Sequence, residues 1–506
     1  MGKTLVLIFS IISFSAFGQM NFCTSDLETF PTRSGGRIKP LYVLATETIK
    51  FISGETKVDN LTATEAFCKL SLKAFGMPLE LPVQVRVDHV DVKKLLGVKD
   101  NDHSLPINDA LLKAGLIDTE LVKQKENNGY KKELTKVKQR LEAYQAIIEA
   151  RLWTVPEIKG SDVEFVSIGQ YLTEARIASA REKSDNPVNF LFSEAKENFL
   201  KIKGDDYLLE LSYFKWNLFM WAMMATLLGV VCLVALKNKW PGAIFTIVTI
   251  GLQITAVTMR VLISGRGPVT NMYETVMFSG LGALVIGCII SLFRKEVAFV
   301  IAGLCFNVLT LMMMKFANGM LDPGISPLVP VLRDNFWLST HVTTVILSYA
   351  ALSLSWLIAN GLMIRDRFFR VSAAEYRYGV DLVYTCIKFG VVLLAGGIIL
   401  GGVWADYSWG RFWGWDPKET WSLIVLLVYI AILHGKSTSW IPPHRFIPLV
   451  AGAFMTVMMA WFGVNYILAS GLHSYGFSEG GAVFLGSFFM IQIAVLILGT
   501  VKRKTA

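Results

Sequence analysis

The chain has 506 residues, of which 53% are hydrophobic, and a mean hydropathy of +0.47, which excludes an ordinary soluble protein. A formal net charge of +9 would suit a nucleic-acid partner, but much of the basic excess lies in short segments between apolar runs, where it reports membrane topology. The six cysteines form no CxxC and no CxxCH motif, so the chain is not itself a c-type cytochrome and has no zinc-knuckle spacing.

Residues 1–18 have the pattern of a secretory signal peptide. Lys3 precedes an apolar run from Leu5 to Phe17 that is too short to span a bilayer, and the small residues around Phe17 fit cleavage after Gly18. An uncleaved anchor is the alternative. In either case the sequence predicts that the following segment is exported.

Residues 19–212 are charged and mixed in composition, and they predict a mainly helical soluble domain outside the membrane. Helical periodicity covers Tyr42 to Ile52 and, as an amphipathic helix that needs a partner face, Tyr130 to Trp153. The segment Ser34-Gly-Gly-Arg-Ile-Lys-Pro-Leu41 is typical of a loop.

Two cysteines and two histidines in this domain are candidates for chemistry. Cys23 and Cys68 could pair if the domain faces an oxidising compartment, but sequence distance does not establish their geometry. His89 and His103 lie in polar surroundings, and we expect solvated side chains there in preference to metal ligands.

Residues 213–506 predict an all-α integral membrane domain, because they contain about nine apolar runs long enough to cross a hydrocarbon core of ~30 Å. The predicted spans are 216–236, 241–263, 275–293, 296–314, 338–363, 379–402, 420–436, 446–468 and 481–500.

The basic residues between these spans are distributed unevenly. If the chain enters from the outside, thirteen lysines and arginines fall in inner loops or the C-terminal tail and five in outer loops. This bias agrees with the positive-inside rule. It places the segment between the sixth and seventh spans outside.

That segment is a predicted outer loop at 403–420. Together with Trp421, which follows it directly, it holds five of the 13 tryptophans. A band of interfacial rings would account for the tryptophans alone. It would not account for Gly410 and Gly414 between the rings, or for the charged residues among them. Because glycines allow tight turns, several rings could lie against one flat apolar ligand. The stretch therefore predicts a platform for a planar ligand.

The run from Trp409 to Glu419, Trp-Gly-Arg-Phe-Trp-Gly-Trp-Asp-Pro-Lys-Glu, resembles the WGxxWxWDxxE signature, or WWD motif, of the haem-handling membrane proteins of cytochrome c maturation. Segments that begin at Gly265, Trp337 and Asn465 look like the CcsA/ResC branch of that family, which belongs to the system II machinery. The resemblance covers roughly residues 215–500. It implies that the tryptophan-rich loop holds haem.

Two histidines flank this loop at the same predicted membrane face, and histidine is the commonest axial ligand of haem iron. The resemblance implies that His341 and His473 are the axial ligands. It further implies that Trp409, Trp413 and Trp415 cover the porphyrin plane. It also implies that Asp416 sets the shape of the loop. The alternative is two unrelated histidines at helix ends.

Other polar residues in the spans have less certain roles. His434 lies toward the inner side, and the resemblance makes it a candidate iron ligand of an inner haem site, whereas its position alone suits an interface histidine. His444 is expected to be solvated. Arg260 and Lys388 should each face a cavity or snorkel, and Arg260 could reach a haem propionate.

The resemblance implies a protein that binds haem b with ferrous iron, presents it outside and attaches it to the CxxCH cysteines of apocytochrome c, as a holocytochrome c synthase with a CcsB/ResB-like partner. It also implies a thiol-reducing thioredoxin-like partner and a place in the bacterial inner (cytoplasmic) membrane, with the N-terminal domain and the haem site on the periplasmic side. The alternatives are a system I haem-handling protein of the CcmC or CcmF type, a membrane b-type cytochrome that carries electrons, and a transporter of another planar molecule.

Overall fold

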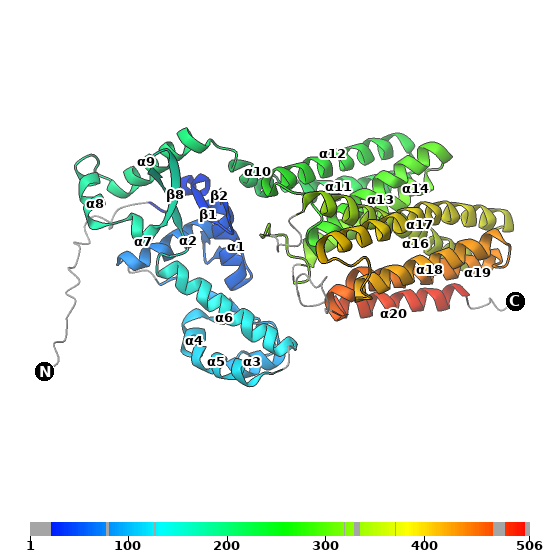
Figure 1. Ribbon diagram of the computed structural model, residues 1–506, viewed down its shortest axis with the longest axis horizontal. Coiled ribbons are helices and arrows are strands. Elements are labelled where there is room, and N and C mark those ends of the chain that lie inside the picture. Colours follow the sequence, from blue (N-terminus) through cyan, green and yellow to red (C-terminus); the bar gives the residue numbers. More distant parts are fainter. Residues whose placement is uncertain are drawn as a thin grey trace. The chain divides into compact units, whose positions relative to one another are not determined.

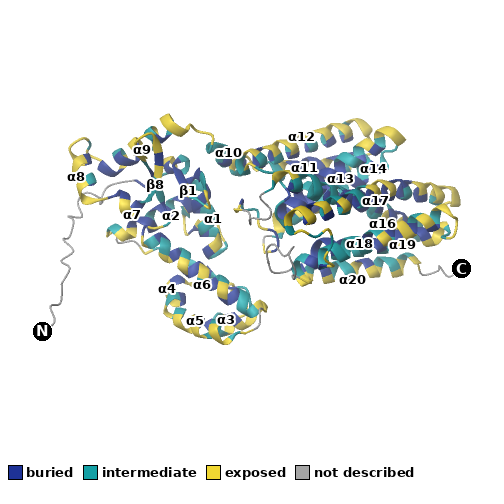
Figure 2. Cartoon of the chain, viewed as in Figure 1, coloured by how far each residue is buried: buried dark blue, intermediate teal, exposed yellow. Residues whose placement is uncertain are grey.

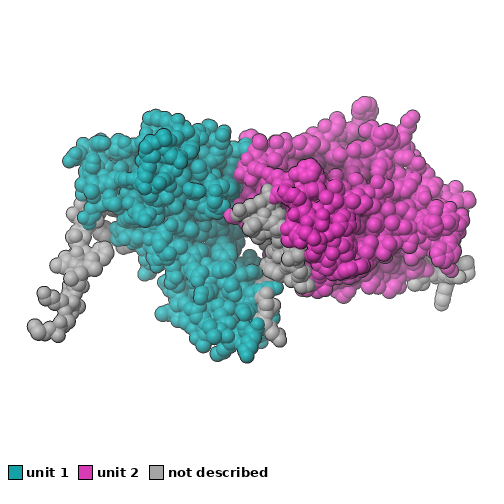
Figure 3. Space-filling model, viewed as in Figure 1, with its two compact units in different colours: residues 1–215 teal, residues 216–506 magenta. Residues whose placement is uncertain are grey.

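A computed structural model describes residues 22–76, 80–125, 128–317, 319–327, 334–369, 371–468 and 481–500. The chain divides into two compact units, residues 1–215 and 216–506 (Figure 3). The predicted signal peptide at 1–18 and the predicted ligand His473 lie outside the described residues.

The first unit is mainly helical, as predicted (Figure 1), and its described residues also form four two-stranded antiparallel sheets. Its helices are α1 (Leu41–Ser53), α2 (Ala63–Ser71), α3 (Val90–Leu96), α4 (Ile107–Leu112), α5 (Ala114–Lys123), α6 (Gly129–Ile148), α7 (Ile168–Tyr171), α8 (Glu174–Arg181) and α9 (Pro187–Lys203). Its strands pair as β1 (Pro31–Ser34) with β2 (Arg37–Pro40), β3 (Lys57–Val58) with β4 (Leu61–Thr62), β5 (Gln84–Arg86) with β6 (Ser104–Pro106), and β7 (Thr154–Lys159) with β8 (Asp162–Ser167).

The structure corrects the prediction of a loop from Ser34 to Leu41. It is the turn and second strand of a hairpin that pairs Pro31 with Pro40 and Ser34 with Arg37. Gly35 and Gly36 have φ values of 60° and 81°. A two-residue turn between twisted strands requires positive φ at both positions, which glycine adopts without strain.

The two helices predicted in this unit are confirmed, with one changed end. The helix predicted from Tyr130 to Trp153 ends at Ile148, and Ala150 adopts φ 55°. The chain then turns, so that the Trp153 side chain is completely buried among Phe22, Phe30 and other rings of the core.

The Cys23–Cys68 pair that the sequence left open is a disulfide. It joins the segment before β1 to α2 across 45 residues of sequence. A cross-link of this loop length restricts the unfolded chain.

We expect Cys68→Ser to lower the stability of the first unit by about 2–4 kcal/mol, because the unfolded chain regains the entropy of the open loop. Thermal unfolding of the full chain, followed by circular dichroism with and without reductant, measures this loss. The wild type under reductant should match the variant. Identical unfolding of the oxidised wild type and the variant would contradict the prediction.

Among the described residues of the second unit, nine helical segments are long and apolar enough to cross a membrane, as predicted. They are α10 (Leu208–Trp216, begun in the first unit) with α11 (Leu218–Val230) and the π-turn η4 (Val231–Ala235); α12 (Lys239–Ser264); α13 (Met272–Arg294); α14 (Ala298–Phe316); α15 (Asn335–Trp337) with the π-turn η6 (Leu338–Val342) and α16 (Thr343–Phe369); α17 (Ala373–Trp409); α18 (Pro417–Ser437); α19 (Pro443–Met458) with the π-helix η7 (Met459–Leu468); and α20 (Gly481–Thr500).

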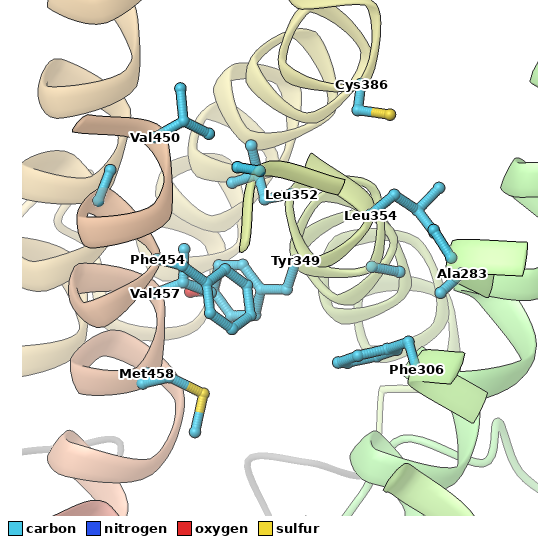
Figure 4. Close-up of a cluster of buried hydrophobic side chains, with 14 of the residues drawn as sticks. Ala283, Phe306, Tyr349, Leu352, Leu354, Cys386, Val450, Phe454, Val457 and Met458 are labelled. Carbon is cyan, nitrogen blue, oxygen red and sulfur yellow. The ribbon is translucent and has the colours of Figure 1, made fainter. Parts of the chain in front are cut away.

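Helix α16 lies at the centre of this unit and packs against α13, α14, α17, α19 and α20. Figure 4 shows its side chains Tyr349, Leu352 and Leu354 among residues of the neighbouring helices. By contrast, α12, α18 and α20 expose apolar side chains along their outer faces (Figure 2). Such faces are expected where a helix meets lipid or another membrane protein.

Candidate functional site

The second unit contains a largely apolar cavity that we call the indole cavity. Its wall comes from the start of α13, from η6 and α16, from the last turns of α17, from the loop 410–416, from α18 and from η7. The lining residues are Val269, Thr270, Asn271, Met272, Thr275, Leu338, His341, Val342, Val345, Ile346, Tyr349, Ile398, Gly401, Gly402, Trp404, Ala405, Trp409, Phe412, Trp413, Lys418, Glu419, Ser422, Ala460, Trp461 and Asn465. Four indoles and one imidazole therefore face one space.

His341 is the candidate metal ligand in this wall. It lies in the π-turn η6, and π-turns within helices occur frequently at functional sites. Its Nδ1 is 2.8 Å from the carbonyl oxygen of Gly397 on α17. A carbonyl can only accept, so Nδ1 carries a proton and donates it to the carbonyl oxygen of Gly397, which fixes the orientation of the imidazole ring.

Glycines on α17 make room for the ring of His341. A Cβ on Gly401 would lie 2.5 Å from His341 Cε1 and 3.0 Å from its Nδ1. Gly397, Gly401 and Trp404 follow one another at helical spacing, and the Trp404 ring centre is 5.8 Å from the His341 ring centre. Sequence reasoning missed Trp404 as a cavity residue, although this spacing from two glycines on one helix face could have found it.

Helix α17 continues to Trp409, so only residues 410–416 of the predicted loop 403–420 lie between helices. Gly410 ends the helix in the left-handed conformation with φ 66°. The chain then brings the Phe412 ring against Gly402, where an added Cβ would lie 2.5 Å from Phe412 Cζ. Trp409 and Trp413 line the cavity as the platform prediction requires.

Trp415 is placed differently from the prediction that it covers a ligand plane. It is 70% exposed and is not a lining residue of the cavity. Its backbone has φ 58°, and its ring meets Trp413 edge to face with centres 5.8 Å apart. Trp415 therefore supports Trp413 from outside.

Asp416 and Glu419 form a capping box at the start of α18. Asp416 Oδ1 accepts a hydrogen bond from Glu419 N at 3.0 Å, and Glu419 Oε2 accepts from Asp416 N at 3.2 Å. Glu419 Oε2 also accepts from Gly414 N at 2.7 Å, and Arg411 Nη1 lies 3.6 Å from Glu419 Oε1. Glu419 thus holds the loop as well as the helix end. Asp416 is buried but does not line the cavity.

We expect Glu419→Ala to lower the stability of the folded loop 410–416 by about 2–3 kcal/mol, because two backbone N–H groups lose a charged acceptor. Trypsin cleavage after Arg411 in the detergent-solubilised chain should become at least about tenfold faster. Glu419→Gln keeps an amide oxygen and should show a smaller effect. Glu375→Ala, which removes the equivalent capping box of α17 with Ser372, is the matched control and should leave this cleavage unchanged. An unchanged rate in Glu419→Ala would contradict the assignment.

The part of the cavity wall at Thr270 is held by a buried ion pair. Arg260 Nε donates to Glu274 Oε1 at 2.7 Å, and the two side chains are 0% and 1% exposed. Arg260 also donates to the carbonyls of Pro323 and Gly324. Glu274 Oε2 in turn accepts from the backbone and hydroxyl of Thr270, which lines the cavity.

This arrangement corrects the prediction that Arg260 reaches a ligand or snorkels. Its charge is neutralised by Glu274 inside the protein, and Arg260 is not a lining residue. Lys388, the other charge predicted within a span, is exposed and lies 4.9 Å from the centre of the Tyr384 ring.

The remaining histidines of the second unit lie away from the cavity or outside the described residues. His434 is exposed in the last turn of α18, about 24 Å along the helix from Lys418 at 1.5 Å per residue. His473 follows η7, whose residue Asn465 lines the cavity. The structure therefore brings His341 together with Trp409 and Trp413 but leaves His434 elsewhere.

Comparison with known proteins points to one family. The model of the family described as cytochrome C assembly protein matches residues 269–473. A cytochrome c biogenesis protein CcsA from Guillardia theta is 33% identical over 48% of this chain and 92% of its own length. A CcsA from Prochlorococcus marinus subsp. pastoris is 31% identical over 49% of this chain and 88% of its own length. The protein NrfI from Wolinella succinogenes is 33% identical over 46% of this chain and 25% of its own length.

Proposed function

Because this chain belongs to the CcsA family of cytochrome c biogenesis proteins, we propose that it binds haem b in the indole cavity and attaches it to the CxxCH cysteines of apocytochrome c. The observation that carries this proposal is His341, whose Nδ1–H donates to Gly397 O at 2.8 Å within an indole-lined wall. This hydrogen bond orients the imidazole, and we propose Nε2 as the atom that binds iron.

The residues of the cavity fit a haem substrate. Its apolar lining and aromatic rings suit a flat macrocycle, and the one imidazole among the lining residues suits its iron. We propose Trp409 and Trp413 as rings that contact the porphyrin, with Trp404 beside the iron ligand. Trp415 and Asp416 are proposed to act through the loop, since neither lines the cavity.

The proposed second axial ligand is His473. The family model covers it together with His341, and it follows η7, which forms part of the cavity wall. Two histidines on opposite sides of the iron would hold a planar haem while its edge stays accessible to a peptide.

Attachment forms two thioether bonds. Each cysteine S–H adds across one vinyl C=C of haem, so that sulfur bonds to one carbon and the hydrogen to the other, and no external oxidant is consumed. The cysteines must be reduced and the iron ferrous at that step. The contribution of this chain is to hold the vinyl groups and the thiols in reacting positions. With a partner, it would act as a holocytochrome c synthase.

We propose a CcsB/ResB-like membrane protein as that partner and a thioredoxin-like protein as the reductant of the apocytochrome thiols. The exposed His434 on α18, a helix with an apolar outer face, would meet the partner and contribute an iron ligand of an inner haem site. The surrounding membrane is proposed to be the bacterial inner membrane. The bias of basic residues toward the predicted inner loops and the Cys23–Cys68 disulfide support a periplasmic first unit and haem site.

The visible spectrum of the purified full chain tests this function. The wild type should show a haem Soret band that moves to the spectrum of a c-type product when a CxxCH peptide, a reductant and the CcsB/ResB-like partner are added. His341→Gly should lose the band or shift it. A band that never transfers would favour an electron-carrying b-type cytochrome, and no band at all would favour a transporter of another planar molecule. A system I protein of the CcmC or CcmF type would pass haem on without the CcsB/ResB-like partner.

A further inference from the structure

Two lysines of the second unit share one aromatic ring. Lys388 Nζ lies 4.9 Å and Lys436 Nζ lies 5.8 Å from the centre of the Tyr384 ring. Lys388 and Tyr384 are one turn apart on α17, whereas Lys436 is in the last turn of α18. The Tyr384 ring packs against the buried Phe446 of α19, with ring centres 6.3 Å apart. Three neighbouring helices therefore hold both cations at one place.

The two ammonium groups have no anionic partner within the described part of the chain. No carboxylate oxygen there lies within 4.0 Å of Lys388 or Lys436. Asp381 lies two turns before Lys388 on the same face of α17, but it is exposed and forms no ion pair with the described residues. A contact with a ring recovers only part of the free energy of a charge beside hydrocarbon, and two cations at one ring repel each other. An anion that contacts both lysines would offset both costs.

The face of α17 that carries Lys388 continues as an apolar stripe, formed by Val392, Ile399 and Val403, and all three side chains are exposed. Residues at these spacings lie on one side of a helix. A helical side chain points back toward the N-terminus of its helix, and the Lys388 ammonium accordingly lies at Tyr384, one turn nearer to the end that the basic residues predict to be inner. The stripe therefore has a cationic end and an apolar length.

We propose that Lys388 and Lys436 bind the phosphate of an anionic phospholipid, whose acyl chain lies along the apolar stripe. Basic pockets between membrane helices on the inner side bind such headgroups. A soluble phosphate would neutralise the lysines but leave the stripe uncovered, and a zwitterionic lipid would bring a cation of its own. Neither lysine lines the indole cavity, so this lipid site is independent of haem binding.

The test compares three ligands that share a phosphate. Dioleoyl phosphatidylglycerol, dioleoyl phosphatidylcholine and glycerol 3-phosphate are each titrated into the purified full chain in nonionic detergent, and native mass spectrometry gives the Kd of the tightest site. One double variant, Lys388→Met with Lys436→Met, removes both charges, and a second changes both lysines to arginine. Lys239→Met with Arg294→Met is the matched control, because it removes two exposed cations from the same predicted end of the membrane unit.

The wild type should bind phosphatidylglycerol at least about tenfold more tightly than phosphatidylcholine, as two lysines at a membrane surface permit. The double methionine variant should lose this preference and bind phosphatidylcholine within about twofold of wild type, which also shows that it is folded. The double arginine variant and the matched control should keep the preference.

An unchanged preference in the double methionine variant would overturn the inference. Glycerol 3-phosphate that binds as tightly as phosphatidylglycerol would overturn it too, since the site would then be one for free phosphate. A wild type that shows no preference, together with a double methionine variant that no longer captures the CcsB/ResB-like partner, would assign the lysines to an acidic protein surface instead.

Discussion

Gly401→Val should weaken haem binding by about ten- to a hundredfold or more. An added Cβ at this position would lie 2.5 Å from Cε1 and 3.2 Å from Nε2 of His341, so the ring must move. Movement of the ring breaks the 2.8 Å hydrogen bond from Nδ1 to Gly397 O, and loss of a hydrogen bond that orients a metal ligand commonly costs this much affinity. Titration of haem into the purified chain, read at the Soret band, measures the change.

Gly396→Ala is the control on the same helix. No heavy atom lies within 4 Å of the position where its Cβ would be built, so this substitution should leave haem affinity unchanged. The haem affinity of Gly401→Ala should lie between the affinities of Gly396→Ala and Gly401→Val. If Gly401→Val binds haem as tightly as Gly396→Ala, the ring of His341 is not held by α17 in the manner proposed.

Arg260→Met should lower the stability of the second unit by about 3–5 kcal/mol. The substitution leaves the carboxylate of Glu274, which is 1% exposed, without its cationic partner. It also leaves the carbonyls of Pro323 and Gly324 without the hydrogen bonds that Arg260 donates. The midpoint of thermal unfolding in detergent, followed by intrinsic fluorescence, measures the loss.

A double variant separates the cost of an unpaired charge from the cost of lost packing. Arg260→Met with Glu274→Gln removes both charges, while the amide oxygen can still accept from Thr270, so much of the stability should return. Lys388→Met removes an exposed cation and should unfold like the wild type. If the double variant is as unstable as Arg260→Met alone, charge burial is not the cause.

The membrane architecture was predictable because it depends on properties that each short stretch of sequence carries. Apolar runs of sufficient length gave nine spans, and the structure has nine candidates among its described residues. The helical periods at Tyr42 to Ile52 and along α6 are confirmed for the same reason. The glycines and charges among the tryptophans indicated a loop, of which residues 410–416 lie between α17 and α18.

Two differences between expectation and structure depended on how helices pack. Arg260 was expected near a ligand, but Glu274 lies beside it only once α12 and α13 are packed. The spacing of Trp404 from Gly397 and Gly401 can be read in the sequence, but its place beside His341 depends on how α16 packs against α17. Trp415 is a local case, since its own backbone has φ 58° and its side chain is exposed outside the cavity lining.

The amino-acid sequence by itself determined the membrane spans, their helical character and the residue types of the tryptophan-rich loop, since hydrophobicity and helical period act over neighbouring residues. Tertiary structure alone decided which side chains share a cavity, which charges neutralise each other and which nitrogen of His341 is hydrogen-bonded to Gly397. These depend on distances between helices that no local pattern contains, and the hydrogen bond from His341 to Gly397 joins residues 56 positions apart.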